Sequence, residues 1–342
     1  VGGNLAWTPS QTATLRLSAG RNRDLSDNFH DATANGYFAT NRDTATLQGD
    51  FGVAAGQRVS AGFEWQRDTV DSDTRYVLAS RDDRALFAQY QGDFGALDVQ
   101  ASARRDDNGQ FGEHSTGNVA LGFDIDPAWR LTLGTGTAFK APTFNELYYP
   151  FGFGNPDLAP ERSRTVEAGI AWKDDDAGIR LDVYQTQVDD LIAYSSTTFR
   201  PENIQRARLR GAELTGNATF GGWAANASLS WVDAKNRTNP TLARFLPRRA
   251  RESARLDLDR TFGAFGFGIT ATGEGERYDD LANSRRLGAF ATVDLRAEYV
   301  INPGWRVQAR VANLFDRAYE TVEYYTQPGR TLFVTLRWSP TR

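Results

Sequence analysis

The chain has 342 residues, a formal net charge of −4 and no cysteine, and 24% of its residues are charged. This length allows one large β domain or two ordinary domains, and the small net charge gives no indication of nucleic-acid binding. The lack of cysteine excludes disulfides and thiolate metal sites, and no apolar run is long enough for a membrane-spanning helix.

The first ten residues, VGGNLAWTPS, contain neither a starting methionine nor the apolar core of a signal peptide. Methionine is absent from the whole chain, while 12% aromatic residues and 32 glycines fit a β protein with many turns. We therefore expect an all-β chain whose sequence begins part-way through a longer gene product.

Stretches in which every second residue is apolar recur from one end of the chain to the other. The clearest of them lie, in chain order, at 97–104, 131–139, 179–184, 254–259, 292–300, 305–311 and 331–338. Alternate side chains of a strand point to opposite faces, so this pattern indicates strands with one apolar and one polar face. Counting in this way predicts about 17 strands and no convincing amphipathic helix.

The connections between these strands alternate in length. Short turns are expected near 8–12, 52–57, 93–96, 126–129, 173–178, 220–223, 261–265 and 301–304. Long polar loops are expected near 25–41, 68–83, 106–115, 140–162, 187–203, 234–249, 276–288 and 313–329. A soluble sandwich has no reason to sort its loops by length, whereas an up-and-down barrel in a bacterial outer membrane has tight periplasmic turns and long outer loops.

Aromatic residues stand at the edges of nearly every short turn. They are Trp7, Phe51, Phe94, Trp129, Trp172, Phe220, Trp223, Phe262, Phe265 and Trp305. Amphipathic rings at one end of a membrane barrel form a girdle at the lipid headgroups. The alternative is that aromatic residues simply favour the ends of strands.

The stretch TVDLRAEYV at 292–300 illustrates what the two faces would meet. We expect the apolar face to meet lipid and the polar face to meet a water-filled lumen, where opposite charges pair across strands. The apolar residues are Val293, Leu295, Ala297 and Tyr299, and the polar ones include Asp294, Arg296 and Glu298. A sheet in lipid must close because each unpaired backbone group costs several kcal/mol. Since single-chain bacterial barrels use an even number of strands, about 17 strands imply truncation at the N-terminus.

Three stretches resemble the TonB-dependent outer-membrane receptors, and more narrowly their vitamin B12 (cobalamin) receptor branch. They are ARRDDNGQFGEHSTGNVALGF at 103–123, GTAFKAPTFNELYYPFGFGNPDLAPERSRTVEAGIAW at 136–172 and ARVANLFDRAYETVEYYTQPGRTLFVTLRW at 309–338. Weaker similarity at 203–220 joins them, so the resemblance covers most of the chain. These motifs are highly specific for the superfamily and only moderately specific for cobalamin over a ferric siderophore.

The resemblance implies a 22-stranded barrel in the outer membrane of a Gram-negative bacterium, with an N-terminal plug inside it. A segment ahead of the plug would engage the energy-transducing protein TonB. The plug, this segment and the first strands are missing, so residues 1–342 would be part of the barrel domain of a monomeric receptor. Family members tend to end on an aromatic residue, whereas this chain continues past Trp338 with SPTR.

The segment 141–161 carries the first candidate ligand contacts. Its four prolines cannot donate to a β-ladder, so it is expected to be an outer loop; they are Pro142, Pro150, Pro156 and Pro160. An aromatic cluster in this loop offers a surface for a large planar ligand; its members are Tyr148, Tyr149, Phe151 and Phe153. The alternative is that the prolines and aromatic residues fold the loop upon itself.

A second candidate lies in FLPRRARESARL at 245–256, where a long loop enters a strand. The resemblance implies that Arg248 falls on a position that contacts cobalamin at the mouth of the barrel. The alternative is that Arg248 and Arg249 pair with acids of the lumen wall.

Catalysis has little support in the sequence. His30 and His114 are both expected in loops, outside any Ser/His/Asp or metal-ligand spacing, so no enzymatic activity is predicted. Five acids near one outer loop have the oxygen chemistry that calcium prefers, but no EF-hand order, and we expect a solvated acidic loop. They are Asp68, Asp71, Asp73, Asp82 and Asp83. The calcium loops of the cobalamin receptors lie in the missing part of the barrel, and no cofactor is expected.

These observations predict an active transporter that imports cobalamin, binding it at the outer loops before an energised movement of the plug. A ferric-siderophore receptor of the same fold is the nearest alternative. A passive porin and an outer-membrane hydrolase are alternatives of other classes. The similarity at 136–172 argues against the porin, and the missing active-site constellation argues against the hydrolase.

Overall fold

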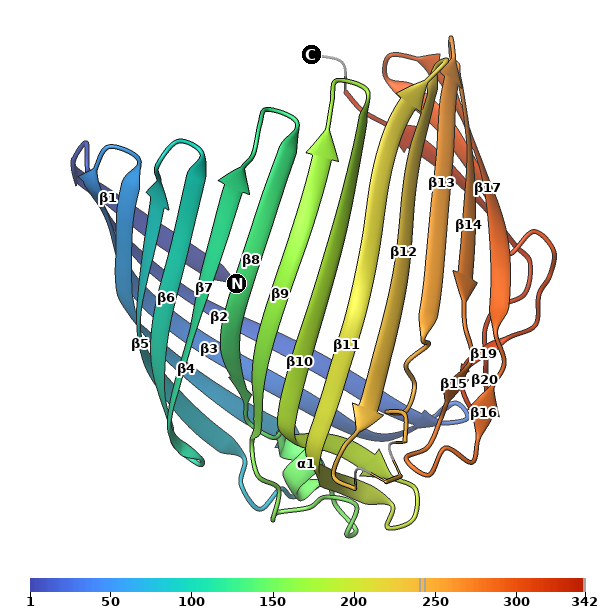
Figure 1. Cartoon of the computed structure of the whole chain (residues 1–342). Coiled ribbons are helices and arrows are strands. Elements are labelled where there is room, and N and C mark those ends of the chain that lie inside the picture. Colours follow the sequence, from blue (N-terminus) through green and yellow to red (C-terminus); the bar gives the residue numbers. More distant parts are fainter. Residues whose placement is uncertain (240, 243, 341–342) are drawn as a thin grey trace. The chain divides into compact units, whose positions relative to one another are not determined.

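The computed structural model describes residues 1–239, 241–242 and 244–340. Most of this part is β-structure, and Figure 1 labels most of its strands and the one-turn helix α1 (Phe144–Tyr148). The chain forms two compact units. Unit 1 comprises Val1–Phe123, Thr132–Val166 and Thr186–Arg206, and unit 2 comprises Asp124–Leu131, Glu167–Gln185 and Ala207–Arg342.

The strands follow one another along each unit. Unit 1 holds β1 (Gly2–Ser10), β2 (Ala13–His30), β3 (Thr33–Ala54), β4 (Gln57–Ser72), β5 (Ser80–Asp93), β6 (Leu97–Asn108) and nearly all of β7 (Gly112–Asp124). Unit 2 holds β12 (Trp223–Asn236), β13 (Glu252–Phe262), β14 (Phe265–Glu274), β15 (Arg277–Tyr278), β16 (Arg286–Leu287), β17 (Phe290–Asn302), β18 (Trp305–Ala312), β19 (Glu320–Val322), β20 (Tyr325–Thr326) and β21 (Thr331–Trp338). Residues of four further strands are divided between the units: β8 (Trp129–Lys140), β9 (Glu161–Lys173), β10 (Ala177–Ser195) and β11 (Arg200–Phe220).

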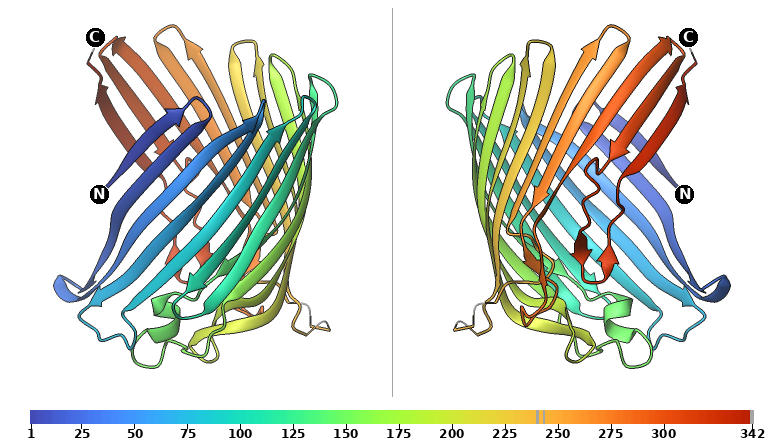
Figure 2. Two further views of the ribbon diagram at one scale, coloured as in Figure 1. Left: turned by 90° about the vertical axis from the view of Figure 1, so that its left-hand side faces the viewer. Right: turned by 90° about the vertical axis from the view of Figure 1, so that its right-hand side faces the viewer.

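Strands of the large sheet that follow one another along the chain pair antiparallel, and the short strands β15, β16, β19 and β20 lie outside this sheet. In unit 1 this holds from β1 to β7, whose blue-to-green ribbons run side by side in Figure 2. In unit 2 it holds from β11 through β14 to β17, β18 and β21. Seventeen strands belong to one sheet, which confirms the predicted strand number and the up-and-down order.

The short turns lie where the sequence predicts them. Examples are residues 11–12 between β1 and β2, 55–56 between β3 and β4, and 263–264 between β13 and β14. The aromatic residues beside them are largely exposed, as Phe262 and Phe265 show.

Four predicted loops, at 25–41, 68–83, 106–115 and 187–203, are shorter than expected because the strands continue into them. β2 reaches His30 and β3 starts at Thr33, so most of 25–41 is a long hairpin, and 106–115 and 187–203 likewise contain strand residues. These strand ends carry polar residues on both faces, as in the pair Arg23 and Asn41. Such ends lack the alternation that reveals a strand, although their backbone ladder persists.

One face of the sheet is apolar and not covered by other parts of the protein. In unit 1 a register row runs through Leu17, Leu47, Phe63 and Leu86. Leu47 is 54% exposed and Leu86 is 63% exposed, so this face does not pack against a protein core. Side chains this apolar are normally buried, and such an extended exposed face needs an apolar environment.

The opposite face carries ion pairs and hydrogen bonds between neighbouring strands. In unit 2 the carboxylate of Asp294 accepts from Arg310 at 2.5 Å, and Glu298 accepts from Gln308 at 2.6 Å. Arg296 reaches across β14 to Asp259 at 2.7 Å. The polar side of 292–300 therefore makes the cross-strand pairs that its sequence predicts.

No helix in the described ranges is both long and apolar enough to cross a membrane.

Candidate ligand-binding loops

The loop at 141–160 in unit 1 folds upon itself around α1. Thr143 caps this helix in a capping box with Glu146, and the side chains of Phe144 and Leu147 are buried. The Tyr76 hydroxyl donates to Asn145 Oδ1 at 2.6 Å. Burial raises the pKa of Tyr76 above its ordinary value, so its proton stays available for this bond. The predicted loop is confirmed, with one turn of helix inside it.

A half-buried arginine of β5 anchors the start of this loop. Arg81 Nη1 donates to the carbonyl oxygen of Pro142 at 2.9 Å, and its guanidinium lies 5.1 Å from the ring centroid of Phe144. At the other end of the loop, Asn203 Nδ2 donates to the Ala159 carbonyl at 3.0 Å. These bonds fix both ends of the loop to unit 1.

The predicted aromatic cluster is divided by this folding. Tyr148 is half-buried, and its hydroxyl accepts from Gln110 Nε2 at 2.7 Å. Tyr149, Phe151 and Phe153 remain exposed, and Phe151 is 88% exposed. The loop therefore folds upon itself, as the alternative interpretation predicts, and still presents three aromatic rings to solvent; binding of a ligand to these rings stays a prediction.

A polar pocket of about 360 Å³ lies in unit 1 beside this loop. Its lining includes Arg81, Asp83, Arg104, Asp106 and Ala141. The Oδ1 atom of Asp83 is buried without a hydrogen-bond partner, although Asn108 donates to its Oδ2 at 3.1 Å. Asp83 thus keeps one buried carboxylate oxygen without a hydrogen bond.

Arg248 in unit 2 is held by an acid of the neighbouring loop. Its Nε lies 2.8 Å from Asp279 Oδ1, and its backbone N–H donates to the Tyr278 carbonyl at 2.6 Å. The Arg248 side chain is 52% exposed, whereas that of Asp279 is only 9% exposed. Pairing with an acid is therefore confirmed for Arg248, and Arg249 is not a free cation either.

Asp279 joins three loops of unit 2, those following β12, β14 and β18. Its Oδ1 also accepts the backbone N–H of Glu323 at 3.4 Å, and the Glu323 carboxylate accepts from Arg285 at 2.7 Å. Asn283 completes the junction by exchanging hydrogen bonds with the backbone of Phe245. The three loops form one connected support for Arg248.

The adjacent Asp280 stabilises the loop that carries Asp279. Burial acts against its charged form, but backbone N–H groups of Arg285 and Ser284 and the Ser284 hydroxyl donate to its carboxylate. These bonds prevail and hold the pKa of Asp280 below its ordinary value.

The hairpin of β19 and β20 presents two tyrosines that the sequence analysis missed. Tyr324 is 81% exposed and Tyr325 is 69% exposed, next to the Glu323 that pairs with Arg285. Two adjacent tyrosines in a predicted outer loop, at 313–329, could have indicated these ligand contacts from the sequence. Tyr148 and Tyr149 belong to unit 1, whereas Arg248, Tyr324 and Tyr325 belong to unit 2.

The two histidines do not lie in loops as predicted. His114 lies in β7 and not in a loop: its ring stacks 3.7 Å from that of Phe139, and Nε2 lies 3.1 Å from the Phe111 carbonyl oxygen. His30 ends β2.

Four of the five acids lie in strands: Asp68 and Asp71 in β4, and Asp82 and Asp83 in β5. Arg42 bonds Asp68 at 2.7 Å, and Arg67 bonds Asp82 at 2.6 Å. The prediction of a solvated acidic loop is therefore wrong for these four, and only Asp73 lies in the loop. Over residues 1–239, 241–242 and 244–340, no group of three or more potential metal-ligating side chains is arranged to hold a metal ion.

Comparison with known proteins places this geometry among outer-membrane barrels. Residues 1–314 match the family model described as "TonB dependent receptor-like, beta-barrel". The vitamin B12 transporter BtuB of Photobacterium profundum is 30% identical over 328 residues, which are 94% of this chain and 54% of that protein. The vitamin B12 transporter BtuB of Vibrio vulnificus is 32% identical over 274 residues, 78% of this chain and 44% of that protein. The chain thus spans about half the length of these relatives.

Solved structures show the same fold at low sequence identity. The copper transporter OprC superposes with a TM-score of 0.80 at 17% identity, covering 98% of this chain and 64% of that one. The ferric citrate transporter FecA, in its unliganded form, superposes with a TM-score of 0.77 at 15% identity, covering 98% and 60%.

Proposed function

The chain belongs to the TonB-dependent receptor β-barrel family, and on this basis we propose that it is part of a transporter that imports cobalamin. Members of this family are outer-membrane proteins of Gram-negative bacteria. The observation that carries the proposal is the identity of 30% and 32% to two proteins named as vitamin B12 transporters.

The outer loops offer two kinds of contact to such a ligand. Tyr149, with Phe151 and Phe153, presents exposed ring faces on which a large planar group can rest. Tyr148 would act through its half-buried ring, since its hydroxyl is engaged by Gln110.

Arg248 would supply the polar contact. Its Nε and Nη2 groups face Asp279 at 2.8 and 3.4 Å, and the rest of its half-exposed guanidinium remains open to a ligand. A fixed guanidinium binds a polar group without first losing side-chain entropy, which favours tight binding.

In this proposal the ligand binds to the outer loops, and a plug, moved by TonB, then opens the way through the barrel. No covalent step is involved. A segment preceding residue 1 would supply the plug and the TonB contact, and the receptor would act as a monomer.

Titration of the full-length receptor with cobalamin and, separately, with a ferric siderophore tests the proposal. We expect saturable binding of cobalamin with a nanomolar Kd. Binding of the siderophore alone would move the chain to the ferric-siderophore receptors, and unsaturable flux of both would indicate a passive porin.

A further inference from the structure

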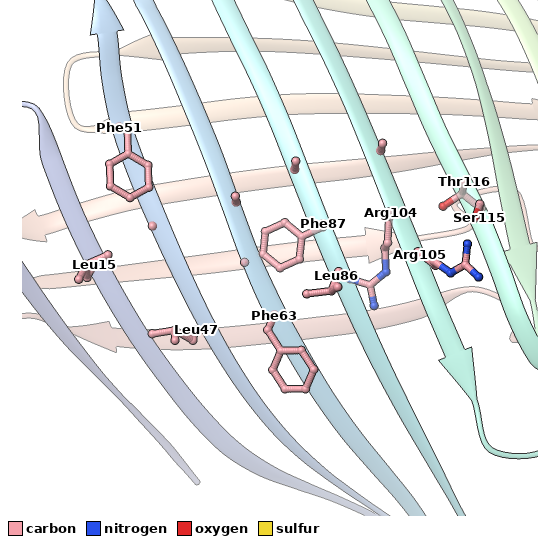
Figure 3. Close-up of a pocket in the computed structure, with 15 residues that line it drawn as sticks. Leu15, Leu47, Phe51, Phe63, Leu86, Phe87, Arg104, Arg105, Ser115 and Thr116 are labelled. Atoms are coloured by element: carbon pink, nitrogen blue, oxygen red, sulfur yellow. The ribbon is translucent and has the colours of Figure 1, made fainter.

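A groove crosses the apolar face of unit 1. It has a volume of about 680 Å³, and Figure 3 shows Phe51 and Phe63 on either side of it, with Leu15 and Arg105 towards its two ends. Arg104, Arg105, Ser115 and Thr116 line one end of the groove, and the rest of its lining is apolar.

The register explains why a groove forms here. Gly49 pairs with Ala61, Ala61 with Ala88, and Ala88 with Ala103, so one row across β3, β4, β5 and β6 has only small side chains. With neighbouring strands about 4.8 Å apart, this row spans roughly 14 Å.

Larger residues stand in the rows on both sides. Leu47, Phe63 and Leu86 line up on one side, and Phe51, Val59 and Tyr90 line up on the other. The small row is therefore a trough with two apolar walls over Ala61, Ala88 and Ala103, and the ring of Phe51 covers Gly49 at its β3 end. Its shape fits an extended hydrocarbon chain.

Two arginines lie on this face beside the Leu86 wall of the trough, where apolar residues give way to charged ones. Arg105 pairs in register with Leu86, and Arg84 lies two residues from Leu86 on the same face of β5, opposite Trp65. The nearest acids on this face, Asp107 and Glu113, lie in the same row as Arg84, on the next two strands, and one row beyond Arg105. Arg105 bonds Glu113 at 2.5 Å, but both side chains are about 60% exposed. An anion beside Leu86 would meet two guanidinium groups first.

A second groove, in unit 2, has similar walls and the opposite charge. It has a volume of about 470 Å³, and its apolar lining includes Leu214, Leu229 and Ala254. The polar lining at its rim includes Glu252 and Glu274, and no arginine or lysine lines it. Hydrocarbon fits both grooves, but an anionic headgroup is complementary only to the groove of unit 1.

We propose that the unit 1 groove binds a lipid of net negative charge from the surrounding membrane, with one acyl chain in the trough and its phosphate on Arg84 and Arg105. The apolar face of an outer-membrane barrel is covered by lipid, so such a molecule is present where the groove lies. A charged hydrogen bond to each guanidinium distinguishes it from the bulk lipid. This inference does not depend on the imported ligand.

Lipid retention by the purified full-length receptor tests it. The receptor is equilibrated in detergent with equal amounts of phosphatidylglycerol and phosphatidylcholine that carry the same acyl chains. Bound lipid is then counted by native mass spectrometry. We expect wild type to retain phosphatidylglycerol about tenfold over phosphatidylcholine, since a net preference equal to one charged hydrogen bond corresponds to about a decade in affinity.

Three variants separate the parts of the site. Ala88→Trp fills the trough and should abolish the preference for phosphatidylglycerol, whereas Ala254→Trp, its counterpart in the unit 2 groove, should leave this preference unchanged. The double variant R84Q/R105Q should lose the preference for phosphatidylglycerol. Equal retention of the two lipids by wild type, or unchanged selectivity in R84Q/R105Q, would overturn the proposal even if Ala88→Trp fails to fold.

Discussion

Asp279 holds the guanidinium of Arg248 through a 2.8 Å bond from Nε to Oδ1, and the same oxygen meets the backbone N–H of Glu323. One nearly buried carboxylate thus connects the loops after β12, β14 and β18. An exposed surface pair contributes little, but an acid shared by three loops fixes their relative positions within unit 2. The order of these loops should therefore depend on this single side chain.

Asp279→Asn should loosen all three loops while the strands of unit 2 stay folded. The amide lacks the charge that holds Arg248, and one of its two polar atoms is no longer an acceptor. Hydrogen exchange in detergent should show faster exchange at 275–289 and 313–329, with unchanged protection in β12 and β13. Glu276→Gln is the matched control, since it neutralises an exposed acid of the same loop that pairs with Arg286. Equal effects of the two variants would show that Asp279 is not the junction.

The loop between β14 and β17 should loosen in acid. The hydrogen bonds to Asp280 lower its folded pKa below the ordinary 3.8, so its charged form stabilises the loop above about pH 4. This contribution is lost as the pH falls towards and through the folded pKa. Limited proteolysis with pepsin between pH 2 and pH 5 should cut 275–289 increasingly below about pH 4. In Asp280→Asn the rate of cutting should be higher at pH 5 and depend less on pH.

The alternating sequence predicted the strands and short turns because that pattern is local. In 292–300 every second side chain lies on the apolar face of the sheet, and the alternation in the sequence is enough to predict this. The ends of β2 and β3 were missed because polar residues occupy both faces there. The pairing of Arg248 with Asp279 joins loops 31 residues apart, and no spacing rule predicts such a contact. Similarly, His114 and Phe139 stack across two strands whose register had to be known first.

Gly268 leaves room for an ion pair that crosses the polar face of β14. Arg296 of β17 and Asp259 of β13 flank it in register and bond across it at 2.7 Å. A Cβ at 268 would collide with Asp259 Oδ1 and lie 2.8 Å from Arg296 Nη2, so these two side-chain ends would have to move apart. Gly268→Ala should therefore cost up to about 1 kcal/mol, the contribution of a partly exposed ion pair, seen as a slightly lower Tm in detergent. At Gly266 on the same strand a Cβ meets only Glu298 Cβ at 3.5 Å, so Gly266→Ala should leave the Tm nearly unchanged.

Arg248 should decide ligand affinity more than stability. A hydrogen bond from a charged group contributes roughly 1.5–3 kcal/mol, so Arg248→Ala should weaken cobalamin binding by the full-length receptor about ten- to a hundredfold. Arg248→Lys should recover only part of this loss, because an ammonium can hold Asp279 but lacks the planar fork needed for a second partner.

The alternative role of Arg248 is purely structural, through its pairing with Asp279. If Arg248 serves only to hold Asp279, Arg248→Ala will lower the Tm and accelerate hydrogen exchange in the three loops while the Kd for cobalamin stays the same. Calorimetric titration of wild type and both variants, with Tm measured on the same samples, separates the two roles. Asp279→Asn adds a check, since it frees the guanidinium without removing it. It should weaken binding less than Arg248→Ala does if the guanidinium itself touches the ligand.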